Sequence, residues 1–126
     1  MSKVDRVVVK RRVRHTKGGA TYVDDVTQME MQLVGWAYRG PKYQKGTPVK
    51  LVVEAYCEAP RKQKAESEPY TVKPDIDNVV KCVMDGLNGV AWDDDCQVTQ
   101  LVASKLPRKK GGGSWTKFSV SPVEED

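Results

Sequence analysis

Hydrophobic and polar positions along the chain predict four strands. Alternation over Pro48–Glu58 is the most regular, with Lys50, Val52, Glu54 and Tyr56 on one face. The opposite face, which we expect to be buried, holds Val49, Leu51, Val53, Ala55 and Cys57. The other predicted strands are Val4–Val13, Gln97–Leu106 and Trp115–Val120. We expect the last two to pair as a hairpin across the turn Gly111-Gly112-Gly113.

Two further segments carry the spacing of an amphipathic helix. The stronger one is Ile76–Leu87, where Asp75 is a natural N-cap and Asn88-Gly89 ends the pattern. Its apolar stripe holds Ile76, Val79, Val80, Val83, Met84 and Leu87. The other helix is expected at about residues 26–39, with a capping box at Thr27–Glu30. Its expected inner face holds Met29, Leu33, Trp36 and Ala37.

The order of these elements predicts an α+β fold. Each helix has one apolar stripe and therefore needs a sheet to cover it. We expect a two-layer domain, in which a four-stranded mixed or antiparallel sheet carries two helices on one face. The 126 residues suit a single domain spanning 1–126, and the polar stretch Ala59–Pro69 is expected to be a loop.

Composition and charge narrow the class of protein. Apolar residues make up 39% and charged residues 30%, and no apolar run approaches the length of a membrane span. The apolar run after the first residues is too short for a signal peptide, so we expect a cytoplasmic protein with no membrane partner. The net charge is +4, with basic residues concentrated over 1–20, 39–64 and 105–117. Basic surfaces attract polyanions, although isolated basic clusters are often merely solvated.

The cysteine and histidine content argues against a zinc site. The three cysteines are far apart in the sequence, and His15 is the single histidine. Structural zinc requires about four such ligands in close spacing. Cys57 and Cys82 occupy apolar positions of their patterns, so we interpret them as core residues, and reduced thiols fit the cytosol.

The candidate chemistry lies in the acidic stretch of residues 75–95, which holds six aspartates against the single basic residue Lys81. On the polar face of the second predicted helix, Asp77, Lys81 and Asp85 follow at i, i+4 and i+8. Asp75 precedes them, and the run Asp93-Asp94-Asp95 follows the helix. Converging carboxylates are ligands for Mg²⁺, and a nearby lysine can stabilise charge on a transferring phosphate. The competing interpretation is structural, because aspartate is common at helix caps and turns.

The motifs of this stretch resemble the signature of RusA-type Holliday junction resolvases. They are KPDIDN at 73–78, Lys81, DGLNG at 85–89 and WDDDCQV at 92–98, and together they cover about a fifth of the chain. The resemblance implies a metal site at Asp75, Asp77 and Asp95, with Lys81 completing the catalytic set. The triple aspartate departs from the family's pair, so Asp94 is the alternative ligand to Asp95. Gly86 also departs from the family, which often has alanine there.

The resemblance further implies an activity and its partners. It predicts a Mg²⁺-dependent endodeoxyribonuclease, with Mn²⁺ as a substitute, that cuts four-way or other branched DNA by paired symmetrical nicks in recombination and repair. It also implies a homodimer, whose two-fold symmetry suits such a junction. We expect phosphate contacts from basic residues near the site and in the first strand, namely Lys73, Lys105, Arg11, Arg12 and Arg14. The alternative is a non-catalytic basic DNA-binding module, but such a module gains nothing from carboxylates that face phosphates.

Overall fold

The computed structural model describes residues 1–11, 14–15, 18, 21–22, 24–58, 71, 73–108 and 111–124. The predicted loop Ala59–Pro69 lies outside these residues. In chain order the elements are β1 (Ser2–Val4), β2 (Arg14–His15), β3 (Thr21–Tyr22), α1 (Asp25–Ala37), β4 (Val49–Glu58), α2 (Ile76–Leu87), the 3-10 helix η1 (Asp95–Gln97), β5 (Val98–Arg108) and β6 (Trp115–Pro122). No helix in the described part of the chain has the length and apolarity needed to cross a membrane.

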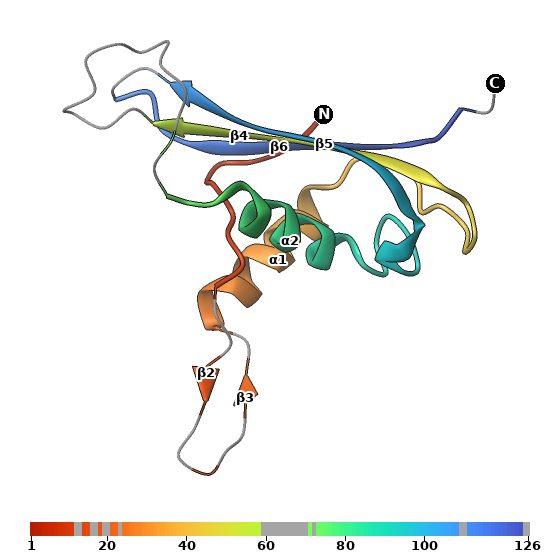
Figure 1. Ribbon diagram of the computed structural model, residues 1–126, viewed down its shortest axis with the longest axis horizontal. Coiled ribbons are helices and arrows are strands. Elements are labelled where there is room, and N and C mark those ends of the chain that lie inside the picture. The colour runs from red at the N-terminus through yellow and green to blue at the C-terminus, as the bar shows by residue number, and fades with distance from the viewer. Residues whose placement is uncertain are drawn as a thin grey trace.

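The predicted fold class is confirmed. Four strands form one mixed sheet in the order β1-β6-β4-β5, and β2 and β3 form a separate antiparallel pair. Figure 1 shows α1 and α2 together on one face of this sheet. β4 is an inner strand, parallel to β5 on one side and antiparallel to β6 on the other.

The core lies between the sheet and the two helices. Every residue predicted for the inner face of β4 is buried, in agreement with the alternation of that strand. From α2, the buried residues are Val79, Val80, Cys82, Val83 and Leu87. Ile76 is 36% exposed, because it starts the helix at the edge of the core. The helix ends at Leu87, as the Asn88-Gly89 pair predicts.

The predicted hairpin between the last two strands is wrong. β5 and β6 do not pair with each other; they flank β4 on opposite sides. β5 runs parallel to β4, because α2 and the turns after it return the chain to the end of the sheet where β4 begins. The turn glycines are nevertheless used as expected, since Gly111 and Gly113 both have positive φ.

The first predicted strand is also wrong over most of its length. Only Ser2–Val4 pairs with β6, and residues 5–11 leave the sheet. Their backbone N–H groups find single partners instead of a strand ladder. The Val8 N–H donates to Thr116 Oγ1 at 3.1 Å, and the Lys10 N–H donates to the Asn78 carbonyl at 2.8 Å. Val8 is fully buried, so its hydrophobic position reflects packing rather than strand pairing.

The inner face of α1 differs from the prediction for the same reason. Its fully buried residues are Thr27, Glu30 and Val34, whereas Trp36 is 73% exposed. Thr27 Oγ1 accepts from the Arg11 N–H and Glu30 Oε1 accepts from the Val9 N–H, each at 3.0 Å. Polar side chains therefore belong inside, where they pair with the N-terminal segment. The helix is capped by Asp24, whose carboxylate accepts from Val26 N and Thr27 N, rather than by Thr27.

Candidate active site

The N-terminus of α2 presents the first two candidate carboxylates. Asp75 occupies the N-cap position, but its side chain makes no capping hydrogen bond. Its carboxylate instead accepts from Lys73 Nζ, at 3.1 and 3.0 Å to the two oxygens. The side chains of Lys73 and Asp75 are 84% and 52% exposed. An exposed carboxylate that does not cap its helix is available to an external cation.

Asp77 and Lys81 lie one helical turn apart. Lys81 Nζ is 3.6 Å from Asp77 Oδ2, and both side chains are more than half exposed. As an isolated surface pair this contact contributes only about 0.3–0.5 kcal/mol to stability. The arrangement places an ammonium and two carboxylates on the solvent side of the first turns of α2.

Lys105 fixes the main chain before these carboxylates. From β5, its Nζ donates to the Pro74 carbonyl at 2.9 Å, so the edge strand is tied to the residue that precedes Asp75. Lys105 is half-buried. Its ammonium therefore holds the entrance of α2 in place, a contact that its sequence position did not reveal.

The three aspartates that follow α2, Asp93, Asp94 and Asp95, lie in three different environments. Asp93 pairs with Lys42 at 3.0 Å, and that hydrogen bond and charge lower the pKa of Asp93. Asp94 caps η1, with its carboxylate accepting from the Cys96 N–H at 3.3 Å. Gln97 completes this capping box and is buried, donating through Nε2 to the carbonyls of Gln44 and Thr47. Asp93 is thus held by a lysine and Asp94 by the backbone of η1, whereas Asp95 interacts with neighbouring acids.

Asp95 lies among other acids. Burial raises the pKa of its carboxyl, and a hydrogen bond with Asp94 and the charges of Asp94 and Asp85 raise it further. The opposing influence is Lys10, whose Nζ lies 2.7 Å from Asp85 Oδ2. A carboxyl crowded by like charges gains from a cation beside it. Lys10 was not singled out by the sequence, because it sits in a segment that was interpreted as a strand.

The three carboxylates implied by the resemblance do not form a ready-made metal site among the described residues. Among the described residues, no group of three acidic, histidine or cysteine side chains is arranged to hold a metal ion. Asp75 and Asp77 supply oxygen ligands that suit Mg²⁺, which is often held by one or two carboxylates together with waters.

The basic N-terminal residues divide into two groups. Arg11 is engaged inside the protein: its Nη1 lies 2.6 Å from Oε1 of Glu30, whose side chain is fully buried. Arg6 binds the same carboxylate through Nε at 2.7 Å. Arg12 and the side chain of Arg14 lie outside the described residues. The sequence pattern did not identify Glu30 as the buried partner of these arginines. Its spacing from Thr27 and Val34 nevertheless places all three on one helix face.

Two comparisons with known proteins bear on this arrangement. The family model described as "Endodeoxyribonuclease RusA" matches residues 6–113. A curated relative, "Uncharacterized protein YqaN" of Bacillus subtilis (strain 168), is 42% identical over 70 residues, covering 47% of this chain and 49% of the relative. The chain thus aligns with about half the length of that relative.

Proposed function

Because this chain belongs to the RusA endodeoxyribonuclease family, we propose that it resolves four-way DNA junctions by paired, symmetrical nicks in recombination and repair. The observation that carries the proposal is the cluster at the N-terminus of α2. Asp75, Asp77 and Lys81 project from the first turns of one helix, and the Asp75 side chain does not cap it. A purely structural role for Asp75 would predict such a capping bond.

We propose that Asp75, Asp77 and Asp95 are the ligands of a Mg²⁺ ion, for which Mn²⁺ can substitute. Such an ion would lower the pKa of an attacking water and neutralise charge on the scissile phosphate. The engagement of Asp94 as the cap of η1 supports Asp95 over Asp94 as the third ligand. In this proposal Lys81 balances negative charge beside Asp77, with which it pairs, and Lys73 meets a neighbouring phosphate.

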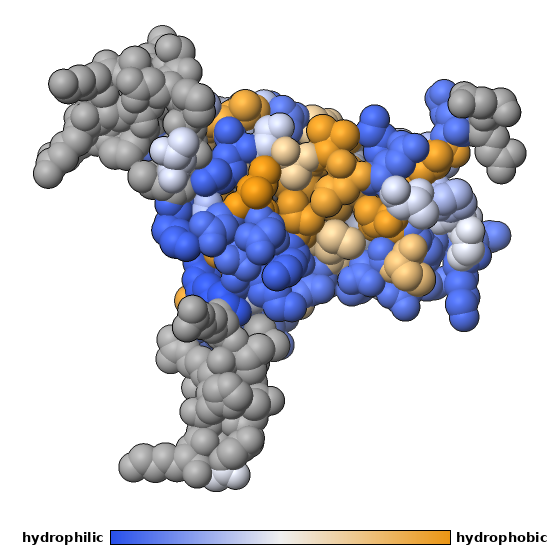
Figure 2. Space-filling view, in the orientation of Figure 1, coloured by the Kyte–Doolittle hydropathy of each residue, from blue (hydrophilic) through white to orange (hydrophobic). Residues whose placement is uncertain are grey.

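We further propose that the protein acts as a homodimer joined through β5. In the described sheet, β5 is an edge strand, and its hydrophobic residues Leu101 and Val102 are 48% and 50% exposed. Figure 2 shows a hydrophobic patch, in orange, on the side of the molecule where β5 runs. An exposed hydrophobic edge strand is a template for pairing with another strand, and a two-fold axis makes that pairing antiparallel.

This pairing would also complete the acidic site. Asp95 lies just before the start of β5, and Lys105, near its end, holds the main chain beside Asp75. Antiparallel pairing of two β5 strands would set the start of one strand beside the end of the other. Asp95 of one subunit would then approach Asp75 and Asp77 of the partner subunit. The dimer would hold two such sites, one for each strand to be nicked.

The first test compares cleavage of a synthetic four-way junction with cleavage of linear duplex, in Mg²⁺, Mn²⁺ and EDTA. We expect metal-dependent cleavage of the junction alone. Asp77→Asn should abolish cleavage while junction binding is kept, because the change preserves shape and removes a ligand charge. Asp93→Asn is the matched control, since Asp93 pairs with Lys42 and should be dispensable. Junction binding without cleavage under every metal condition would support the non-catalytic alternative.

Mixed dimers test the sharing of residues between subunits. Asp77→Asn and Asp95→Asn homodimers should both be inactive. A dimer with one chain of each kind would retain one intact site if Asp95 serves the partner's site, and should nick one strand. If each chain builds its own site, both sites of the mixed dimer are damaged and no nicking occurs. The second outcome would overturn the shared site.

A further inference from the structure

The solvent-facing side of α1 is unusual for its lack of charge. After Asp25, the only charged residue of the helix is Glu30, which is fully buried. The exposed side instead carries Gln28, Gln32 and Trp36, spaced at i, i+4 and i+8. Solvated helix faces normally carry charged residues, and Trp is an uncommon residue to leave 73% exposed. This face therefore has the composition of a contact surface.

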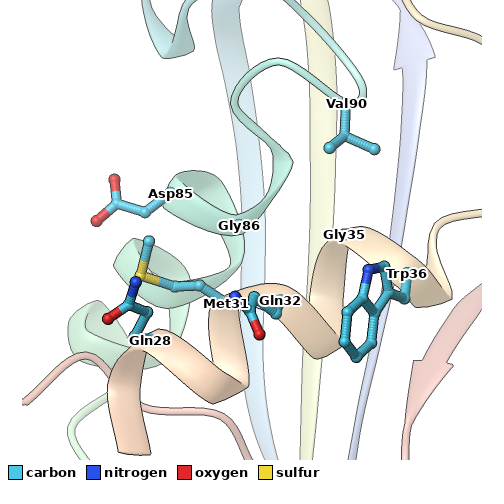
Figure 3. A pocket seen from close by; sticks show the side chains of 8 residues that line it. All are labelled: Gln28, Met31, Gln32, Gly35, Trp36, Asp85, Gly86 and Val90. Atoms are coloured by element: carbon cyan, nitrogen blue, oxygen red, sulfur yellow. The ribbon is translucent and has the colours of Figure 1, made fainter. Parts of the chain in front are cut away.

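A groove beside this face runs between α1 and α2. Figure 3 shows it with Trp36 and Val90 toward one end and Gln28 and Asp85 toward the other. Its volume is about 360 Å³. Gly35 and Gly86, which line it, allow the two helices to approach closely, because a β-carbon on Gly35 would lie 3.2 Å from the Gly86 carbonyl oxygen. The groove is open to solvent.

The chemistry of the groove selects against charged ligands. Its one charged lining residue is Asp85, and that carboxylate is neutralised by Lys10 at 2.7 Å. What remains is an indole, two amides and apolar side chains. An indole stacks on flat aromatic rings, and glutamine amides bond the donor and acceptor edges of bases. A neutral heterocycle with a hydrogen-bonding edge fits both features.

We propose that this groove receives an unstacked nucleobase of the DNA, which stacks on Trp36 and bonds to Gln28 or Gln32. The inference rests on the proposed function, because a junction provides bases at its branch point that can leave the stack. The exposed Arg39 follows the C-terminal end of α1, three residues after Trp36. Its guanidinium is our candidate contact for a phosphate next to the base.

The test uses the full chain and a junction with 2-aminopurine at branch-point positions, in the Asp77→Asn background to prevent cleavage. This base fluoresces when unstacked and is quenched against an aromatic ring. Trp36→Leu should brighten the probe and weaken junction binding by roughly tenfold, the scale of one lost base–aromatic stack. Trp36→Phe should restore most of the binding. Met29→Ala is the matched control, because Met29 is exposed on the same helix but does not line the groove.

Quenching by acrylamide gives a second readout. Trp92 is fully buried and Trp115 half-buried, so Trp36 is the most accessible indole. Junction DNA should protect it from the quencher, and Trp36→Phe should remove that change. Unchanged binding and probe fluorescence in Trp36→Leu would overturn the base site, as would a loss of dimer in that variant without any probe response. Failure of the wild type to cut any junction would instead refute the proposed function.

Discussion

Gly86 in α2 packs so closely on α1 that a β-carbon there would stand 2.6 Å from the carbonyl oxygen of Met31. It would also lie 2.9 Å from the Val34 β-carbon. The sequence shows only the cost of this glycine, which lowers helix propensity by about 1 kcal/mol relative to alanine. The contact explains the choice, because the helices can cross at this distance only where one of them lacks a side chain.

Gly86→Ala should therefore destabilise the protein despite its better helix propensity. Overpacking against main-chain atoms costs about 1–3 kcal/mol and the better propensity recovers about 1 kcal/mol, so we expect a net loss of up to about 2 kcal/mol. Urea unfolding and thermal melting measure the change. Gln32→Ala, at an exposed position of α1, should alter stability by less than about 0.5 kcal/mol. A Gly86→Ala protein as stable as wild type would mean that α1 moves freely away from α2.

Substitution of Lys81 distinguishes a surface ion pair from a catalytic role. If it only pairs with Asp77, Lys81→Ala should cost less than about 0.5 kcal/mol of stability and leave cleavage unchanged. We expect instead a fall of roughly a hundredfold in single-turnover cleavage rate with normal folding and binding. Lys81→Arg should not restore the full rate, because a planar guanidinium does not replace a compact ammonium. A near-normal rate for Lys81→Ala would remove this lysine from the catalytic set.

Asp95 and Asp93 should affect stability in opposite directions. Burial and neighbouring acids raise the pKa of Asp95, so its ionised form destabilises the folded state at pH values above that raised pKa. Asp95→Asn should increase Tm at neutral pH, and the gain should shrink as the pH falls through the raised pKa. Lys42 lowers the pKa of Asp93, so Asp93→Asn should decrease Tm at neutral pH, with the loss disappearing in acid. Melting curves across the acidic range measure both, and equal signs would contradict the environments described.

Replacement of Arg11 should lower the stability of the protein, whereas replacement of Arg12 and Arg14 should affect DNA binding. Arg11→Ala leaves the buried Glu30 with Arg6 as its remaining cation. We expect a loss of about 1–2 kcal/mol, below the 3–5 kcal/mol of a fully buried pair because Arg11 is partly exposed. Replacing Arg12 and Arg14 by alanine should instead lower the salt dependence of junction binding by about one unit of slope per phosphate contact. An unchanged slope would show that this segment does not meet DNA.

The thiols should differ sharply in reactivity. Burial raises the pKa of Cys82 to about 12, and it also raises the pKa of the buried Cys57. Cys96 is exposed. Because the thiolate is the reactive form, a thiol reagent should label one cysteine in the native protein and all three after unfolding. Rapid labelling of Cys82 in the native state would indicate frequent opening of the core beneath α2.

The sequence alone determined the regular elements that bury one face. The alternation of β4 and the periodicity of α2 identified the inner residues of the strand and most of those of the helix, because each side chain of a regular element points in a direction set by its local period. The two-layer fold followed, since each apolar face needed a cover. The motifs at residues 73–98 also identified the family, because their spacing is local to one helix and the turn after it.

Tertiary structure decided which elements meet. Alternation identifies the face of a strand but not its neighbour, so the placement of β5 and β6 on opposite sides of β4 was not predictable from either strand. The burial of Thr27 and Glu30 depends on a segment about twenty residues away that needs hydrogen-bond acceptors. The contact from Lys105 to the Pro74 carbonyl likewise arises from packing between distant segments. Such contacts depend on the whole fold, so the local periodicity of the sequence does not predict them.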